Sequence, residues 1–153
     1  MAEWVVDTKV LAWSVDVIDI SKMMSAKSFL EGMINGNHRL VLDEGKHIYG
    51  EYRNVIIKPY RKQSDFAKVW LTRMMGMRNL VYYPGDLPDC HHEYLMGKNF
   101  HEDDCPFVGA AFNSTDKNLV AEPDRHYNDD VIEYIENTLE INRYTVDRAC
   151  THV

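Results

Sequence analysis

The residues of this chain best suited to chemistry are acids that lie next to short apolar segments. Asp7 directly follows apolar residues 4–6, Asp124 lies shortly after residues 118–121, and Asp104 precedes the largely apolar residues 107–112. Hard cations such as Mg²⁺ prefer carboxylate oxygens, and water held by such an ion can attack a phosphodiester. Acids so far apart in the chain support this chemistry only if the fold brings them together.

The segment FHEDDCPFVGAAF, residues 100–112, sharpens this question, because three consecutive acids precede what we expect to be a buried helix. The macrodipole and the free N–H groups of a helix N-terminus stabilise negative charge, which explains one or two of these acids. We expect one of the others to belong to a metal site whose remaining ligands lie elsewhere in the chain.

The hydrophobic pattern predicts short strands that alternate with amphipathic helices. Strands are expected at residues 4–6, 39–42, 118–121 and 144–146, and residues 80–83 are either a strand or an extended connection. Helices are expected at 20–34, from 48 to a stop near Pro59, from an N-cap at Asp65 through 66–77, at 107–112, and from Asn128 or Asp129 to 139. Residues 85–99 have no readable pattern. The alternation predicts an α/β fold with a mostly parallel sheet covered on both faces.

Length and composition indicate one ordinary globular domain over residues 1–153, with 45% hydrophobic and 27% charged residues. The chain has no apolar run of about 18 residues and no basic leader, and its three cysteines are an odd number. We therefore expect a soluble, cytoplasmic, unprocessed protein with no membrane partner. The net charge of -7 argues against a broad basic face for nucleic acid, but divalent ions can neutralise a carboxylate cluster locally.

The predicted topology brings the acids to one edge. Asp7, Asp43 and Asp124 follow predicted strands, and ligands of such sheets bind at the carboxyl ends of the strands. A crossover helix runs antiparallel to the strands, so its N-terminus, with Asp103 or Asp104, lies at the same edge. Carboxylates gathered in this way repel one another strongly unless a cation lies between them.

Four stretches of the chain resemble the PIN-domain ribonucleases, a family that includes toxins of toxin-antitoxin pairs. VVDTKVLAW resembles the first strand of the family with its metal-binding acid, and RLVLDEGKHIYGEYRNVI resembles the second strand and the helix that carries its Glu. DDCPFVGAAF and NLVAEPDRHY are similar to the segments with the third and fourth acids. The resemblance covers roughly residues 3–128.

The resemblance implies a three-layer α/β/α fold and an Mg²⁺- or Mn²⁺-dependent endoribonuclease. Its catalytic and metal-binding residues would be Asp7, Glu51, Asp104 and Asp124. Glu44, roughly 10 Å from Glu51 at 1.5 Å per helical residue, is the alternative to it. The family commonly forms homodimers, and its toxins bind an antitoxin protein, so an RNA substrate, a second copy and an antitoxin are the implied partners.

The remaining charges near these motifs have secondary roles in this interpretation. Asp43 and Asp103 would be acids at the rim of the site, and Lys9, Arg53 or Arg125 would contact phosphate or only solvent. Lys9 replaces a frequent Asn of the family, and Pro123 lies where a small or flexible residue usually leads to the last acid. These departures are the basis of an alternative function: a catalytically inactive PIN-like binding or scaffold protein.

Two further alternatives stay open. The segment DCHHEYLMGKNFHEDDC offers zinc ligands, and a structural Zn²⁺ could order it; the candidates are Cys90, His91, His92, His101 and Cys105. VVDTK also resembles a first strand with an aspartyl nucleophile, as in Mg²⁺-dependent phosphatases, although Lys9 stands where such enzymes have a second Asp.

Overall fold

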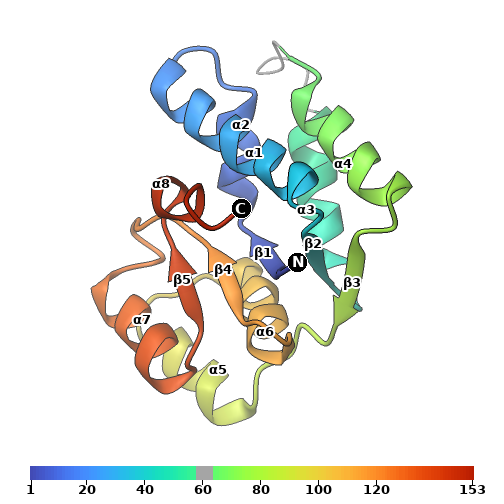
Figure 1. Ribbon diagram of the computed structural model, residues 1–153. Helices are drawn as coiled ribbons and strands as arrows, with labels where there is room; N and C mark the ends of the chain where they lie inside the picture. Colours follow the sequence, from blue (N-terminus) through green and yellow to red (C-terminus); the bar gives the residue numbers. More distant parts are fainter. Residues whose placement is uncertain (58–63) are drawn as a thin grey trace.

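A parallel sheet forms the centre of the computed structural model, which describes residues 1–57 and 64–153 (Figure 1). Its strands are β1 (Glu3–Val6), β2 (Arg39–Asp43), β3 (Leu80–Tyr83), β4 (Asn118–Val120) and β5 (Asn142–Tyr144). They lie in the order β3-β2-β1-β4-β5, and every neighbouring pair is parallel. The predicted α/β class and the parallel sheet are confirmed.

Helices connect the strands and cover both faces of the sheet. They are α1 (Thr8–Ser14), α2 (Ile20–Asn35), α3 (His47–Ile57), α4 (Phe66–Gly76), α5 (Asp89–Met96), α6 (Cys105–Asn113), α7 (Asp129–Glu133) and α8 (Val146–Ala149). A 3₁₀ turn, η1 (Glu102–Asp104), leads into α6, and a π-helical segment, η2 (Tyr134–Thr138), continues α7.

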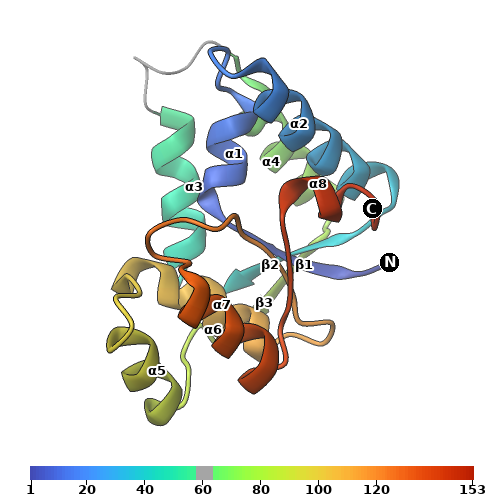
Figure 2. The same cartoon turned by 90° about the vertical axis from the view of Figure 1, so that its left-hand side faces the viewer.

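The strand order explains the layers. From β1 the chain moves outward through β2 to β3, and then returns to the other side of β1 to add β4 and β5. Right-handed crossovers in opposite directions place their helices on opposite faces. Accordingly, α1–α4 cover one face and α5–α7 the other, while α8 returns to pack on α2, which completes three α/β/α layers (Figure 2).

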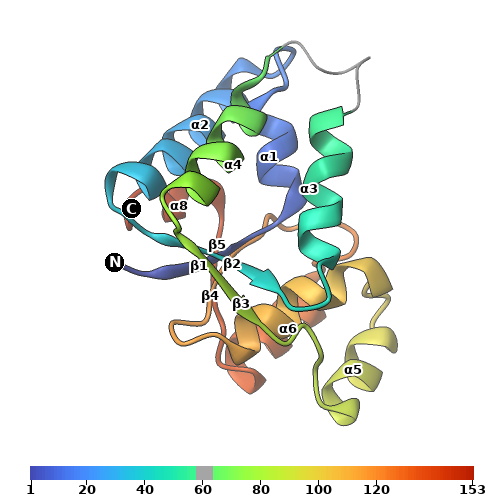
Figure 3. The ribbon, with the colours of Figure 1, turned by 90° about the vertical axis from the view of Figure 1, so that its right-hand side faces the viewer.

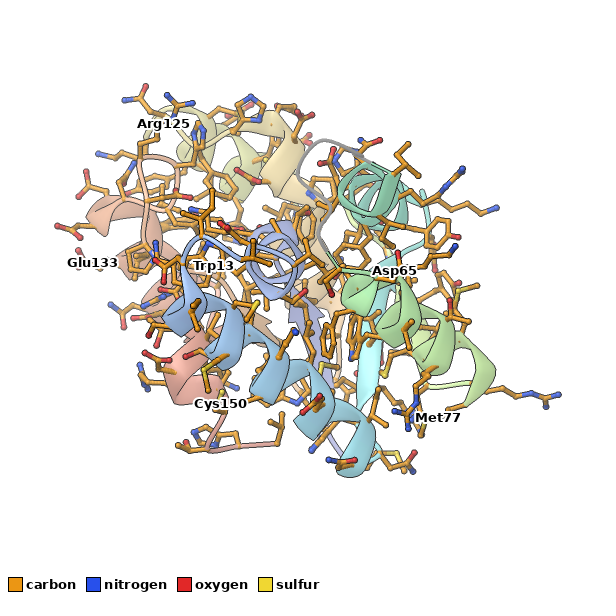
Figure 4. All side chains as sticks on the ribbon, turned by 90° about the horizontal axis from the view of Figure 1, so that it is seen from above. Trp13, Asp65, Met77, Arg125, Glu133 and Cys150 are labelled. Carbon is orange, nitrogen blue, oxygen red and sulfur yellow. The ribbon has the colours of Figure 1, made fainter. Side chains whose placement is uncertain are left out.

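Most expected elements are present, with differences at their ends. Asp65 and Met77 flank the two ends of α4 (Figure 4), and Asn128 caps α7 by accepting the N–H of Val131 at 3.0 Å. Residues 80–83 are a strand. β5 lies two residues earlier than expected, and it ends at Tyr144 because α8 starts at Val146. The expected stop at Pro59 lies outside the described residues.

Two close contacts fix the elements that carry the acids. The hydroxyl of Tyr52 on α3 donates to the carbonyl oxygen of Val6 at 2.5 Å, immediately before Asp7. On α6, Gly109 lies so close to the loop after β3 that an added Cβ would be 1.9 Å from the carbonyl oxygen of Gly85. A larger residue there would displace α6, and with it Asp104.

Among the described residues, none of the helices has the length and the apolar character needed to cross a membrane.

Candidate active site

The candidate site lies where the strand order reverses. β1 and β4 are neighbours in the sheet, but the chain leaves them in opposite directions, so their carboxyl ends border the crevice in which α/β proteins bind ligands. Asp7 follows β1, Asp124 follows β4, and Asp104 precedes the crossover helix α6 that leads to β4. The predicted convergence of these three acids therefore has a topological cause.

Asp7 is the most buried of the three acids. Its side chain caps α1 by accepting the N–H of Lys9 at 3.3 Å, a long and weak hydrogen bond. Burial raises the pKa of Asp7 to about 7, and the negative charge of Asp104 and, to a smaller extent, that of Asp124 act in the same direction. A carboxyl group held in this way is half protonated near neutral pH unless a cation compensates its charge.

Asp104 is placed at the N-terminus of α6, but it is not used to cap that helix. It occupies the N-cap position, and its carboxylate accepts no capping hydrogen bond. Burial raises its pKa; the charges of His126 and His101 oppose this shift, while Asp124 and Asp103 reinforce it. The segment 102–104 therefore carries one acid whose carboxylate does not cap the helix and whose charge interacts with those of Asp7 and Asp124.

Asp124 is held by the loop that carries it and by a lysine. One carboxylate oxygen accepts the N–H groups of His126 and Tyr127, both at 2.8 Å, and the other accepts Lys9 Nζ at 2.7 Å. Burial by itself would raise the pKa of Asp124, but these hydrogen bonds and the lysine charge lower it below its usual value. Lys9 thus supplies an internal cation on one side of the acidic cluster.

Two hydroxyl groups near the acids are buried without a described partner. Tyr127 is 1% exposed, and neither its Oη nor Thr8 Oγ1 forms a hydrogen bond with the described residues. Burial raises the pKa of Tyr127 well above 10, and the charges of Asp7, Asp104 and Asp124 add to the shift, which locates its ring beside them. Because a buried hydroxyl without a partner is costly, these groups fit a site that holds additional polar ligands such as metal-bound water.

Glu51, the fourth acid that the resemblance implies, is on α3. Its carboxylate is 3.8 Å from His47 Nε2, and the structure describes no contact between it and Asp7, Asp104 or Asp124. It lines an open surface pocket of about 410 Å³ formed by residues of α3 and the turn before it: Lys46, His47, Gly50, Glu51, Arg53, Asn54 and Ile57. The start of α3 lies against α6 (Figure 3), and His47, at one end of this pocket, contacts the backbone of Asp103, which precedes Asp104.

The acids expected at the rim have separate roles. Asp43 accepts the N–H groups of His47 and Ile48 at 3.0 and 2.8 Å, so its carboxylate is used to start α3. Asp103 is exposed, and its carbonyl oxygen lies 3.0 Å from His47 Nε2. Glu44, the alternative to Glu51, is exposed in the turn between β2 and α3.

Sequence reasoning did not predict several contacts near the acids. The rings of His101 and His126 lie 5.1 Å apart, and the charges of both histidines act on Asp104, although 25 positions separate them in the sequence. Tyr127 and the pairing of Lys9 with Asp124 were also not predicted, since no local pattern marks contacts across the sheet edge. Arg125, a candidate phosphate contact, is exposed at the edge of the molecule (Figure 4).

Chemically, three carboxylates around buried hydroxyls offer hard oxygen ligands for a divalent cation, and Lys9 offers a positive charge for an anionic substrate. Comparison with known proteins finds no matching family model, no similar curated protein and no similar solved structure. The geometry and the motifs are therefore the basis of the functional assignment.

Proposed function

We propose that this protein is a divalent-metal-dependent ribonuclease of the PIN type. The observation that carries the proposal is the gathering of Asp7, Asp104 and Asp124 at the strand-order reversal, with Asp7 buried so deeply that its pKa is about 7. Natural proteins retain such mutually repelling carboxylates at functional sites, where a cation compensates their charge.

The proposed roles follow from the positions of the side chains. Asp7, Asp104 and Asp124 would hold Mg²⁺ or Mn²⁺, and Glu51, included through the resemblance, would act from α3 through bound water. The bound ion would supply an activated water and charge stabilisation for hydrolysis of an RNA phosphodiester. Asp124 can release Lys9 when a cation reaches the cluster, and the lysine ammonium is then available to a phosphate oxygen.

The pocket on α3 fits an RNA backbone that continues from this site. Lys46 and Arg53 line this pocket, are exposed, and offer positive charge in a chain of net charge -7. The resemblance further suggests a homodimer and, if the protein is a toxin, an antitoxin partner. These two partners rest on analogy with the family alone.

The Lys9–Asp124 ion pair favours a second candidate, a PIN-like binding or scaffold protein without catalysis. In that case the lysine ammonium, 2.7 Å from the Asp124 carboxylate, permanently takes the place of a metal ion. This candidate predicts no Mn²⁺-dependent hydrolysis and no stabilisation by divalent ions.

Cleavage of a labelled mixed RNA pool tests the proposal, with Mn²⁺, Mg²⁺ or EDTA in parallel reactions. We expect cleavage only with a divalent ion, and loss of cleavage in Asp7→Asn and Asp104→Asn. Asp19→Asn is the matched control, because Asp19 caps α2 through the N–H of Lys22, outside the acidic cluster. Absence of cleavage by the wild type with either ion, or full activity of both site variants, would contradict the ribonuclease function.

A further inference from the structure

A second group of metal-ligand side chains lies where α5, η1 and α6 meet. His92 on α5, Glu102 in η1 and Cys105 at the start of α6 each offer one ligand atom, and these atoms lie within 4.8 Å of one another. His92 Nε2 is 3.1 and 3.2 Å from the two carboxylate oxygens of Glu102. None of the three belongs to the acidic cluster proposed for the ribonuclease.

We propose that His92 Nε2, the Glu102 carboxylate and Cys105 Sγ bind one Zn²⁺ ion, with a fourth position open to water or an external ligand. Imidazole, carboxylate and thiolate are all ligands of zinc, and three protein ligands with one open position are a common arrangement. The thiolate makes Mg²⁺ or Ca²⁺ a poor match, because these ions prefer oxygen.

The three ligand atoms can reach zinc-binding distances if the His92 and Glu102 side chains move slightly toward Cys105. With Zn–N about 2.0 Å and Zn–S about 2.3 Å, neighbouring ligand atoms of a tetrahedral site are separated by about 3.3 to 3.6 Å. The His92–Glu102 separation of 3.1 Å is already close to this value. Cys105 is buried and fixed at the first residue of α6, whereas the His92 and Glu102 side chains are 37% and 70% exposed and can close onto it.

A reactive cysteine is a poorer explanation of this group. Burial raises the pKa of Cys105 to about 12, with the charges of Glu102 and Asp104 adding to the shift, so the thiol stays protonated and weakly nucleophilic without a cation. A divalent ion would compensate both the carboxylate and the thiolate.

The remaining zinc ligands expected from the sequence, Cys90, His91 and His101, either contact other groups or are exposed. His91 Nδ1 is 2.6 Å from the hydroxyl of Tyr134, His101 Nδ1 accepts the N–H of Asp103 at 3.2 Å, and Cys90 is exposed on α5. The proposed site thus keeps His92 and Cys105 of the five expected ligands and adds Glu102. Cys90 and His91 supply matched controls on the same helix.

The proposed ion would link α5 to the start of α6, next to Asp104. It would therefore stabilise the segment that presents one of the acids, without entering the acidic cluster. The zinc site does not depend on the ribonuclease function and can be tested apart from it.

Metal titration of the full-length, metal-free protein tests the proposal. Co²⁺ is the spectroscopic probe, because thiolate ligation produces an intense charge-transfer band, and Zn²⁺ should abolish this band by displacing Co²⁺ from the thiolate. We expect Cys105→Ser to abolish the band and His92→Gln to weaken the Co²⁺ and Zn²⁺ binding that the band reports at least tenfold, whereas Cys90→Ser, His91→Gln and Asp7→Asn retain the wild-type band. Circular dichroism in EDTA verifies that each variant is folded, and the largely surface-exposed His92→Gln change keeps the test informative if Cys105→Ser does not fold.

Three results would overturn the zinc site. They are absence of the band in the wild type, persistence of the band in folded Cys105→Ser, and zinc binding that is lost in Asp7→Asn but unchanged in His92→Gln. The last result would assign the ion to the acidic cluster.

Discussion

Replacing Asp7 by Asn should stabilise the metal-free protein at neutral and alkaline pH. The folded state holds the Asp7 proton up to a pKa of about 7, against 3.8 for an unperturbed group. Between these values the folded protein binds more protons than the unfolded chain, so the free energy of unfolding falls as the pH rises through this window. Ionisation of Asp7 therefore costs stability, and Asn does not ionise.

The magnitude follows from the size of the shift. About three pKa units at 1.36 kcal/mol each correspond to about 4 kcal/mol at pH 8. At pH 5, only about one unit above the unfolded pKa of Asp7, the corresponding value is about 2 kcal/mol. Asn can keep the α1 cap, because its side-chain oxygen can accept the N–H of Lys9 as Asp7 does. The gain in stability should thus be largest at high pH.

Urea unfolding followed by circular dichroism, in EDTA at pH 5 and pH 8, measures both values. Asp19→Asn is the control, since it changes a partly exposed helix cap in the same way and should give no pH-dependent gain. Saturating Mn²⁺ should narrow the difference in unfolding free energy between Asp7→Asn and the wild type. The ion stabilises the wild type by about 2.7 kcal/mol at a concentration of 100 times Kd. A variant no more stable than the wild type at pH 8, or a gain that is equal at both pH values, would refute this account of the site.

Three other substitutions test separate features of the structure. Gly109→Ala should destabilise the fold by about 3 kcal/mol in urea unfolding, because the added Cβ would lie 1.9 Å from the Gly85 carbonyl oxygen; stability equal to the wild type would contradict the close contact. Lys9→Met should raise Mn²⁺ affinity in calorimetry at least several-fold by freeing Asp124, and unchanged affinity would show that the lysine does not compete with the ion. Tyr127→Phe should raise the free energy of unfolding in EDTA by about 1 kcal/mol, because it removes a buried hydroxyl without a described partner; a loss of stability would reveal an unseen hydrogen bond.

The convergence of the acids was predictable because it depends on general sheet geometry. Strand ends and the N-termini of crossover helices share one edge of a parallel sheet, which brings Asp7, Asp104 and Asp124 together. The same rule applies to Asp43, which also follows a strand. The rule alone therefore does not distinguish an acid that caps a helix, such as Asp43, from an acid of the cluster, such as Asp7. α3 begins four residues after Asp43, so that carboxylate caps the helix, whereas Asp7 accepts one long hydrogen bond and faces other acids.

Other features depend on contacts that no local pattern encodes. The ion pair of Lys9 and Asp124 joins residues 115 positions apart, and it determines how much of the Asp124 carboxylate is free. α5 was not predicted because Leu95 is its single fully buried residue, so the apolar stripe of an amphipathic helix is missing. α1 has seven residues, too few to establish a helical period by themselves.

The measurement that tests the central claim most directly is calorimetric titration of the metal-free protein with Mn²⁺. Wild-type protein should bind the ion, and Asp104→Asn and Asp124→Asn should each lose most of the affinity, while Asp19→Asn binds as the wild type does. Absence of Mn²⁺ binding by the wild type, or wild-type affinity in both Asp104→Asn and Asp124→Asn, would contradict the metal site and favour the non-catalytic binding protein.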